Sequence, residues 1–326
     1  MRAVDRPDRR LTLRTYSHLL GARRIPSEYE ITTSQLLYYV GRGFEVRVPV
    51  ASWYERYQRG SPLGCPDWEQ FHDPRATTYS EYTRLQQAQE IFVDGLLQSI
   101  EGTEYDRKLA PEWLGVLART LAPLRYPLHG LQMAAAYVGQ MAPSGRIVIC
   151  ALLQAADEVR RIERISQRMA QLRRLHSGFG DDAPSLWLSE PSWQPLRETI
   201  ERLLVTWDFG EALVALGVCV KPALDRVLRA RLAERAVANG DYLWAQILAA
   251  LDEDAKWQRT WTGALLRLVV GADAHNLSVV RGWLDKWHPP ARRAAATISA
   301  LWGDEPAQVE RWLEAEREIV FSGEPA

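Results

Sequence analysis

The feature that most limits how this chain can fold is a run of 31 residues, 146–176, that contains neither glycine nor proline. Both residues disfavour a helix interior, so their absence over such a length favours one unbroken α-helix. At 1.5 Å per residue that helix would be about 46 Å long, which suits the central helix of a large bundle. Residues 241–270 predict a second long helix, and from about residue 76 onward we expect an all-α fold.

Composition places the chain among ordinary soluble globular proteins and argues against two kinds of partner. Of its 326 residues 47% are hydrophobic and 25% are charged, and the net charge is −1. Without a basic excess we expect no nucleic acid as a partner, and no uncharged apolar run reaches the roughly 18 residues of a membrane span. Cys65, Cys150 and Cys219 are far apart and show no zinc-binding spacing, so we expect reduced thiols in a cytoplasmic protein.

Residues 1–75 differ from the rest of the chain, because they show little helical periodicity and are rich in proline, glycine, tyrosine and arginine. We expect them to form a largely extended arm that supplies subunit contacts, followed by a helical domain over residues 76–326. One short strand is predicted at residues 44–50, where apolar side chains occupy every second position.

Prolines set several predicted helix boundaries. Pro111 is expected to start a helix, and Pro123 and Pro127 are expected to interrupt the apolar run that follows. Toward the end of the chain three shorter helices are predicted, at 276–287, 291–302 and 306–320. The helix expected after Pro74 has one predicted face, formed by Tyr82, Leu85, Gln89, Phe92 and Leu96.

The first long helix carries residues with the spacing of a metal-binding motif. Residues 157–161, Asp-Glu-Val-Arg-Arg, have the frame of a D-E-x-R-H iron motif, with Arg161 in the histidine position. Di-iron sites in helical bundles take a Glu-x-x-His pair from each of two helices, because positions i and i+3 project from one face. Arginine cannot ligate a metal, since it stays protonated and offers only hydrogen-bond donors.

The second long helix carries a counterpart to this motif. The tetrapeptide Asp254–Trp257 has the frame of the second pair, with Trp257 in the histidine position, and Lys221 lies about where another helix would supply a glutamate. Together with Glu158 and Arg161, these positions predict a metal site that has lost its ligands and a chain without catalytic residues. The alternative is that three helices simply carry charged residues, as helices commonly do.

Three other patterns are interpreted as ordinary features. The acid-x-x-His pairs Glu69–His72 and Asp285–His288 are each followed closely by proline, so neither is expected inside a long helix. The arginine-rich stretch 160–174 spreads its charges over several helix faces. We therefore expect a solvated or subunit-facing surface there, and no phosphate site.

Five long stretches indicate a family: RTYSHLLGARRIPSEYEI (14–31), GSPLGCPDWEQFHDP (60–74), PLRYPLHGLQMAAAYVGQMAP (123–143), LLQAADEVRR (152–161) and WDFGEALVALGVCVKPAL (207–224). In these stretches the chain resembles the β subunit of the hydroxylase component of bacterial multicomponent monooxygenases, in the toluene and alkene monooxygenase branch. The resemblance extends from about Arg14 to at least Lys286.

The resemblance implies a ferritin-like bundle of the ribonucleotide reductase type, paralogous to a catalytic α subunit and without iron ligands of its own. It implies an (αβγ)2 hydroxylase whose di-iron centre lies in α. The electron-transfer partners would carry NADH, FAD and Fe–S groups in a reductase and a ferredoxin, and a small effector protein would complete the system. Such a hydroxylase inserts one oxygen atom of O2 into an aromatic ring or across an alkene.

Replacement of the ligands predicts how the remaining charges are arranged. We hypothesise that Glu158, Asp254, Lys221 and Arg161 form an ion-paired cluster in place of the metal, because a lone buried carboxylate is costly.

Two functions other than a scaffolding subunit are compatible with the sequence. One is an autonomous di-iron enzyme with unusual ligands, which requires iron in the isolated chain. The other is a free-standing helical adaptor or regulatory protein, which predicts a stable monomer with a polar surface.

Overall fold

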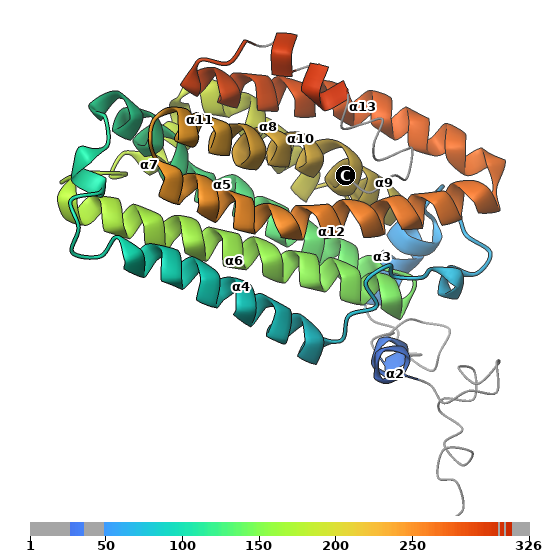
Figure 1. The fold of residues 1–326 in the computed structure, drawn as a ribbon. Coiled ribbons are helices and arrows are strands. Elements are labelled where there is room, and N and C mark those ends of the chain that lie inside the picture. The colour runs from blue at the N-terminus through green and yellow to red at the C-terminus, as the bar shows by residue number, and fades with distance from the viewer. Residues whose placement is uncertain (1–26, 36–48, 306, 310, 315–326) are drawn as a thin grey trace, which may run out of the picture.

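The computed structural model describes residues 27–35, 49–305, 307–309 and 311–314, and in these ranges all regular structure is helical (Figure 1). The all-α prediction is therefore confirmed. In the same ranges no helix is both long enough and apolar enough to cross a membrane. The helices are α2 (Glu28–Gln35), α3 (Pro49–Tyr54), α4 (Tyr79–Ser99), α5 (Pro111–Met141), α6 (Gly145–Leu175), α7 (Ala183–Ser189), α8 (Gln194–Leu204), α9 (Phe209–Val214), α10 (Lys221–Asp225), α11 (Leu232–Ala238), α12 (Tyr242–Ala272) and α13 (Ala274–Ser299).

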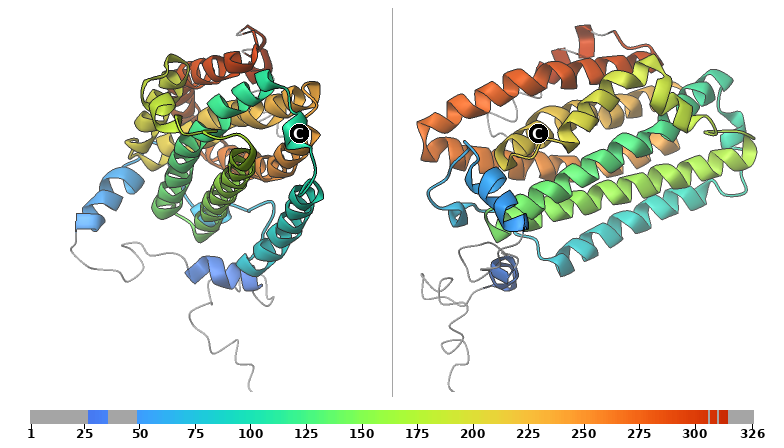
Figure 2. Two further views of the ribbon diagram at one scale, coloured as in Figure 1. Left: turned by 90° about the vertical axis from the view of Figure 1, so that its left-hand side faces the viewer. Right: turned by 180° about the vertical axis from the view of Figure 1, so that it is seen from behind.

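Helix α6 has long helices as neighbours on several sides, and its remaining side is exposed (Figures 1 and 2). Helix α5 packs against it along its length, while α12 and α4 lie beside it (Figures 1 and 2). Helices α6 and α12 contain 31 residues each, so both long helices predicted from the sequence are confirmed. Helices α9, α10 and α11 follow one another without a break, because π-helical turns at Ala215–Val220 and Arg226–Arg231 join them. This segment packs against α12 and α13.

Helix α6 begins at a defined cap and buries charged as well as apolar side chains. The Ser144 hydroxyl accepts a hydrogen bond from the backbone N–H of Arg146 at 3.3 Å, which satisfies one of the free N–H groups of the first turn. Arg173 and Arg174 occupy the last turn, where the helix dipole favours cations. Its buried side chains include Glu158 and Arg161, so α6 supplies part of the polar core.

The prediction that Pro123 and Pro127 interrupt a helix is wrong, because α5 runs unbroken from Pro111 to Met141. Pro111 does begin the helix, as predicted. Proline has no N–H, so Pro123 leaves the carbonyl of Arg119, four residues earlier, without its helical donor. The indole N–H of Trp193 donates to that carbonyl at 3.2 Å. A side chain 74 residues further along the chain therefore replaces the lost hydrogen bond.

The predicted helices 276–287 and 291–302 form one helix, α13, which continues through Pro289 and Pro290. The Asp285–His288 pair consequently lies inside a long helix, contrary to expectation. Of the third predicted helix, 306–320, residues 307–309 and 311–314 are helical, and the remainder lies outside the described residues.

The predicted face of α4 is shifted around the helix axis. The fully buried side chains of this helix are Tyr82, Gln86, Val93 and Leu97, whereas Phe92, expected to be buried, is 53% exposed. One of the four buried residues, Gln86, is polar. An apolar periodicity alone therefore did not identify the face that contacts the bundle.

The described part of the N-terminal arm contains short helices as well as irregular chain. Residues 28–35 form α2, residues 49–54 form α3, and Trp68–Gln70 form one 3-10 turn. The strand predicted at 44–50 is contradicted at its last two residues, which are helical, and its other residues lie outside the described ranges. The Trp53 indole N–H donates to the Tyr137 hydroxyl at 3.0 Å, which attaches the arm to α5.

Substitution of Gly130 by alanine tests the close approach of α5 and α8. A Cβ at Gly130 would lie 2.3 Å from Cγ2 of Ile200, so we expect the variant to lose about 1–3 kcal/mol of unfolding free energy in a urea titration. A Cβ at Gly115, on the same helix, would meet no neighbouring side chain within 4 Å, and G115A is expected to gain about 0.5–1 kcal/mol. Equal shifts for the two variants would contradict this packing.

Candidate functional site: a buried ion cluster in the bundle core

Lys221, at the start of α10, contacts a carboxylate of α6 in the core of the bundle. Its Nζ lies 2.5 Å from Oε1 of Glu158 and 2.9 Å from Oδ2 of Asp225, one turn further along its own helical segment. All three side chains are almost inaccessible to solvent. A buried ammonium group is thus neutralised by two buried carboxylates, as such a charge requires.

Two arginines complete this ion cluster, which consists of Glu158, Arg161, Lys221, Asp225 and Arg229. Arg161 Nη1 lies 3.0 Å from Oδ1 of Asp225 and 3.5 Å from Oε2 of Glu158. Arg229 Nη2 lies 2.6 Å from Oδ2 of Asp225, and its Nη1 donates to the Leu251 carbonyl of α12. Three cations therefore surround two carboxylates, and Asp225 contacts all three.

The charges around Asp225 and Arg229 outweigh the effect of burial on the pKa of each of these two groups. Burial alone would raise the pKa of Asp225, but the nearby Arg229, Lys221 and Arg161 hold it well below its usual range. Burial, with the like charge of Arg229, lowers the pKa of Arg161. For Arg229 burial acts to lower the pKa, and the opposing charges of Asp225 and Glu158 raise it overall. The cluster is therefore a set of fixed, paired charges.

The hypothesis that Glu158, Asp254, Lys221 and Arg161 form one cluster is right for three of these residues and wrong for Asp254. Arg161 and Lys221 do pair with Glu158, whereas Asp254 on α12 binds Arg160, whose Nη2 lies 2.9 Å from Oδ2 of Asp254. Residues 160 and 161 leave a helix about 100° apart, so neighbouring arginines serve different sides of α6. Asp254 also accepts a hydrogen bond from Gln86 of α4 at 3.0 Å, and it lies outside the ion cluster.

Trp257 also takes no part in the ion cluster. It is buried, and the guanidinium carbon of Arg75 lies 5.0 Å from the centre of its ring in a cation–π contact. The i, i+3 spacing of Asp254 and Trp257 suggested that both side chains face one metal position. Instead, Asp254 contacts Arg160 and Trp257 contacts Arg75.

The prediction of a solvated or subunit-facing surface for the arginine-rich stretch 160–174 is wrong for the arginines within its first nine residues, 160–168. Arg160, Arg164 and Arg168 are buried at successive i+4 positions of α6. They bind acidic side chains of α4 and of the segment after it, in the pairs Arg160–Glu90 (3.2 Å), Arg164–Asp94 (2.5 Å) and Arg168–Asp106 (2.8 Å). These three arginines form a ladder that attaches α4 to α6.

The model of the methane, phenol and alkene hydroxylase family matches residues 53–273, which include every residue of the ion cluster. The chain belongs to this family. A toluene-4-monooxygenase hydroxylase component subunit beta from Ectopseudomonas mendocina is 36% identical over 300 residues, which cover 90% of this chain and 91% of that protein. The oxygenase component of a phenol 2-monooxygenase from Pseudomonas sp. strain CF600 is 25% identical over 72% of this chain and 70% of that protein.

Solved structures of hydroxylases in this family have the same fold. A chain of toluene 4-monooxygenase, in a structure with toluene bound in the resting active site, is 34% identical with a TM-score of 0.82, covering 89% of this chain and 98% of that one. A chain of phenol hydroxylase from Pseudomonas sp. OX1 is 18% identical with a TM-score of 0.81, covering 91% of both chains. The family resemblance predicted from the sequence is confirmed.

A di-iron centre does not fit the side chains that this hydroxylase-family chain places around Glu158. Iron in such sites takes carboxylate and neutral imidazole donors. The oxygens of Glu158 instead face Lys221 and Arg161, which are cations and cannot donate an electron pair. Within the described ranges no three His, Cys, Asp or Glu side chains are grouped so as to hold a metal. No step of O2 chemistry is assigned to these residues.

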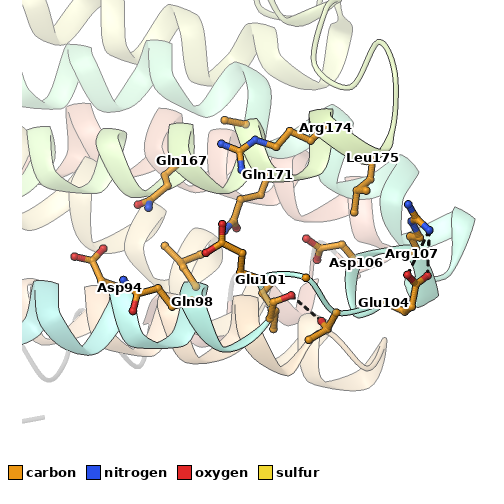
Figure 3. A pocket seen from close by; sticks show the side chains of 15 residues that line it. Asp94, Gln98, Glu101, Glu104, Asp106, Arg107, Gln167, Gln171, Arg174 and Leu175 are labelled. Carbon is orange, nitrogen blue, oxygen red and sulfur yellow. Dashed lines mark hydrogen bonds and ion pairs between the residues drawn. The ribbon is translucent and has the colours of Figure 1, made fainter.

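A surface hollow of about 530 Å³ lies where α4 ends, against the last turns of α6 (Figure 3). Polar and charged side chains form most of its lining, among them Asp94, Glu101, Gln98 and Gln171. Ligand pockets for apolar molecules are lined mainly by hydrophobic and aromatic side chains. This hollow therefore lacks the lining that a hydrocarbon substrate would need.

The sequence interpretation missed Asp225 and Arg229, although a signal for both was present. Lys221, Asp225 and Arg229 follow one another at i+4 spacing with alternating charge, which is the pattern of ion-paired side chains on one helix face. The same spacing in Arg160, Arg164 and Arg168 indicated a single face. Neither pattern by itself distinguishes a buried face from an exposed one.

Proposed function

We propose that this chain is the non-catalytic, structural β subunit of a soluble di-iron hydroxylase, and that it supports a catalytic α subunit in an (αβγ)2 assembly. The observation that carries the proposal is the contact of Lys221 with Glu158, because a cation occupies the side of that carboxylate where the motif would place a metal. Similarity over 90% of the chain to a hydroxylase subunit beta also supports it.

In the proposed assembly the partners of this chain carry out oxygen insertion and electron transfer. The α subunit would hold the di-iron centre, and the hydroxylase would insert one oxygen atom of O2 into an aromatic ring or an alkene. Electrons would come from NADH through FAD and Fe–S groups of a reductase and a ferredoxin, with a small effector protein acting on the hydroxylase. We place this system in the cytoplasm, consistent with three free cysteines.

The contact with α is proposed to involve the arm, residues 1–75, and the outer faces of the bundle. An obligate interface of this kind is expected to bury more than about 2,000 Å². Large apolar side chains are exposed on the outer sides of α4 and α6, including Ile91, Phe92 and Val159. Burial in a permanent complex would account for this exposure.

Co-purification of a tagged copy from its own cells, under conditions that induce the hydroxylase, tests the proposal. We expect a larger α-type chain and a small γ-type chain to accompany the tag in equal amounts. Iron measured by mass spectrometry should appear only in fractions that contain the α-type chain. The matched variant Glu158→Gln is expected to leave the iron content of the complex unchanged, since Glu158 ligates no metal in this proposal.

Two results would replace the proposed function. Iron in the isolated, partner-free chain, lost in the Glu158→Gln variant, would indicate an autonomous di-iron enzyme. A partner-free monomer without iron would favour the free-standing adaptor or regulatory protein.

A further inference from the structure

Helix α4 is fastened to the bundle by a second polar cluster, distinct from the ion cluster. The Tyr82 hydroxyl of α4 donates to Oδ1 of Asp157 on α6 at 2.7 Å. The side-chain amide of Gln86, one turn further along α4, donates to Oδ1 of Asp157 at 2.9 Å and to Oδ1 of Asp254 on α12 at 3.0 Å. A single amide nitrogen thus bridges two carboxylates that come from different helices.

This acid pair has more hydrogen-bond acceptors than donors around it. Asp157 and Asp254 are both more than nine-tenths buried, and Gln258 of α12 donates to Oδ2 of Asp157 at 2.9 Å. The amide oxygens of Gln86 and Gln258 are buried too, and among the described residues neither has a hydrogen-bond partner. The cluster therefore contains unsatisfied acceptors, which an added proton would partly satisfy.

Positive charge near the pair is also limited. Among the residues that the structure describes, the cation that pairs with it is Arg160 of α6, which binds Oδ2 of Asp254 at 2.9 Å and divides its charge with Glu90 of α4. Two like charges bridged by a common nitrogen repel each other strongly in a buried site. Both the excess of acceptors and the excess of negative charge favour one bound proton.

We propose that Asp157, buried beside Asp254, holds a proton near neutral pH, and that this proton keeps α4 against α6 and α12. The proton comes from solvent and returns to it, so no other group changes. Burial and the charge of Asp254 raise the pKa of Asp157 to about 7, against the opposing effects of the Tyr82 and Gln258 hydrogen bonds and of Arg160. This inference stands independently of the proposed function.

The sign of the pH dependence follows from the raised pKa. An exposed aspartate loses its proton near pH 4, so opening of α4 releases the proton whenever the pH exceeds that value. The stabilisation of closed α4 is complete below about pH 4 and is lost as the pH rises to about 7. Above that pH Asp157 is charged beside Asp254 in the closed state, and the helix opens more easily.

Hydrogen–deuterium exchange of α4 in the purified hydroxylase complex, or in the full chain, tests the proposal. After correction for the intrinsic exchange rate, we expect amides of α4 to open about tenfold more often at pH 8 than at pH 6, while α5 shows no such change. In the Asp157→Asn variant the difference between the two pH values should disappear. The infrared band of a protonated carboxyl, present in the wild type at pH 6 and absent at pH 8, should be missing from the variant.

The Asp94→Asn variant provides the matched control. Asp94 also joins α4 to α6, through Arg164, but its side chain is 47% exposed and it makes no contact with the acid pair. This variant should open more often at both pH values and keep the tenfold ratio. A wild-type ratio near one, an unchanged ratio in Asp157→Asn, or no protonated carboxyl at pH 6 would each overturn the proposal.

Discussion

Replacement of Asp225 by asparagine is expected to lower the free energy of unfolding by about 3–5 kcal/mol, the usual cost of removing one partner from a buried ion pair. Asparagine has nearly the same shape, so packing is kept while the negative charge is lost. Lys221 and Arg161 would then keep Glu158 as their buried carboxylate, and Arg229 would lose its contact of 2.6 Å with Asp225. Urea unfolding followed by circular dichroism measures the effect.

The Asp225 prediction has a matched control and a pH signature. Glu253→Gln on α12 removes an exposed acid that pairs with Lys256 at 2.8 Å, and its unfolding midpoint should match that of the wild type. Because the pKa of Asp225 is lowered in the folded chain, its stabilisation is present above about pH 4 and is lost as the pH falls further. Similar midpoints for Asp225→Asn and Glu253→Gln would show that the cluster does not hold the core together.

Replacement of Trp261 by alanine is the second substitution for which a large loss is expected, about 3–5 kcal/mol. Trp261 lies in α12, is only 2% exposed, and donates its indole N–H to Oε1 of Gln154 on α6 at 3.2 Å. The variant would leave a cavity between the two long helices and an unpaired amide oxygen. A urea titration with an unchanged slope but a lower midpoint is the expected result.

Trp261→Phe separates the two contributions to that loss. Phenylalanine fills much of the space but cannot donate to Gln154, so its stability should lie between those of the wild type and of Trp261→Ala. If Trp261→Ala unfolded at the wild-type midpoint, the tight contact between α6 and α12 would be contradicted.

The sequence predicted the long helices well because their signal is local. Residues 146–176 lack both helix-breaking residues, and the structure forms α6 over nearly the same range. Pro123 misled for the opposite reason, since the hydrogen bond that keeps α5 continuous comes from Trp193, far along the chain. Helix breaking by proline is a local rule, and a distant donor can offset it.

The sequence predicted correctly only those residues of the candidate site that share one face of a helix. Glu158 and Arg161 lie three residues apart and do meet at one place, where Lys221 joins them. Asp254 was assigned to the same place by its position in a motif frame. Spacing establishes which residues share a face but not which neighbour that face contacts, and Asp254 contacts Arg160 instead.

The ion cluster also has a consequence for how folding depends on iron. A bundle that needs bound metal for its core becomes less stable as the free metal concentration falls, because binding to the native state alone contributes to stability. Here both signs of charge are side chains of one polypeptide, present in a fixed ratio as soon as translation ends. We therefore expect that starvation for iron, or a strong chelator, leaves this cluster intact.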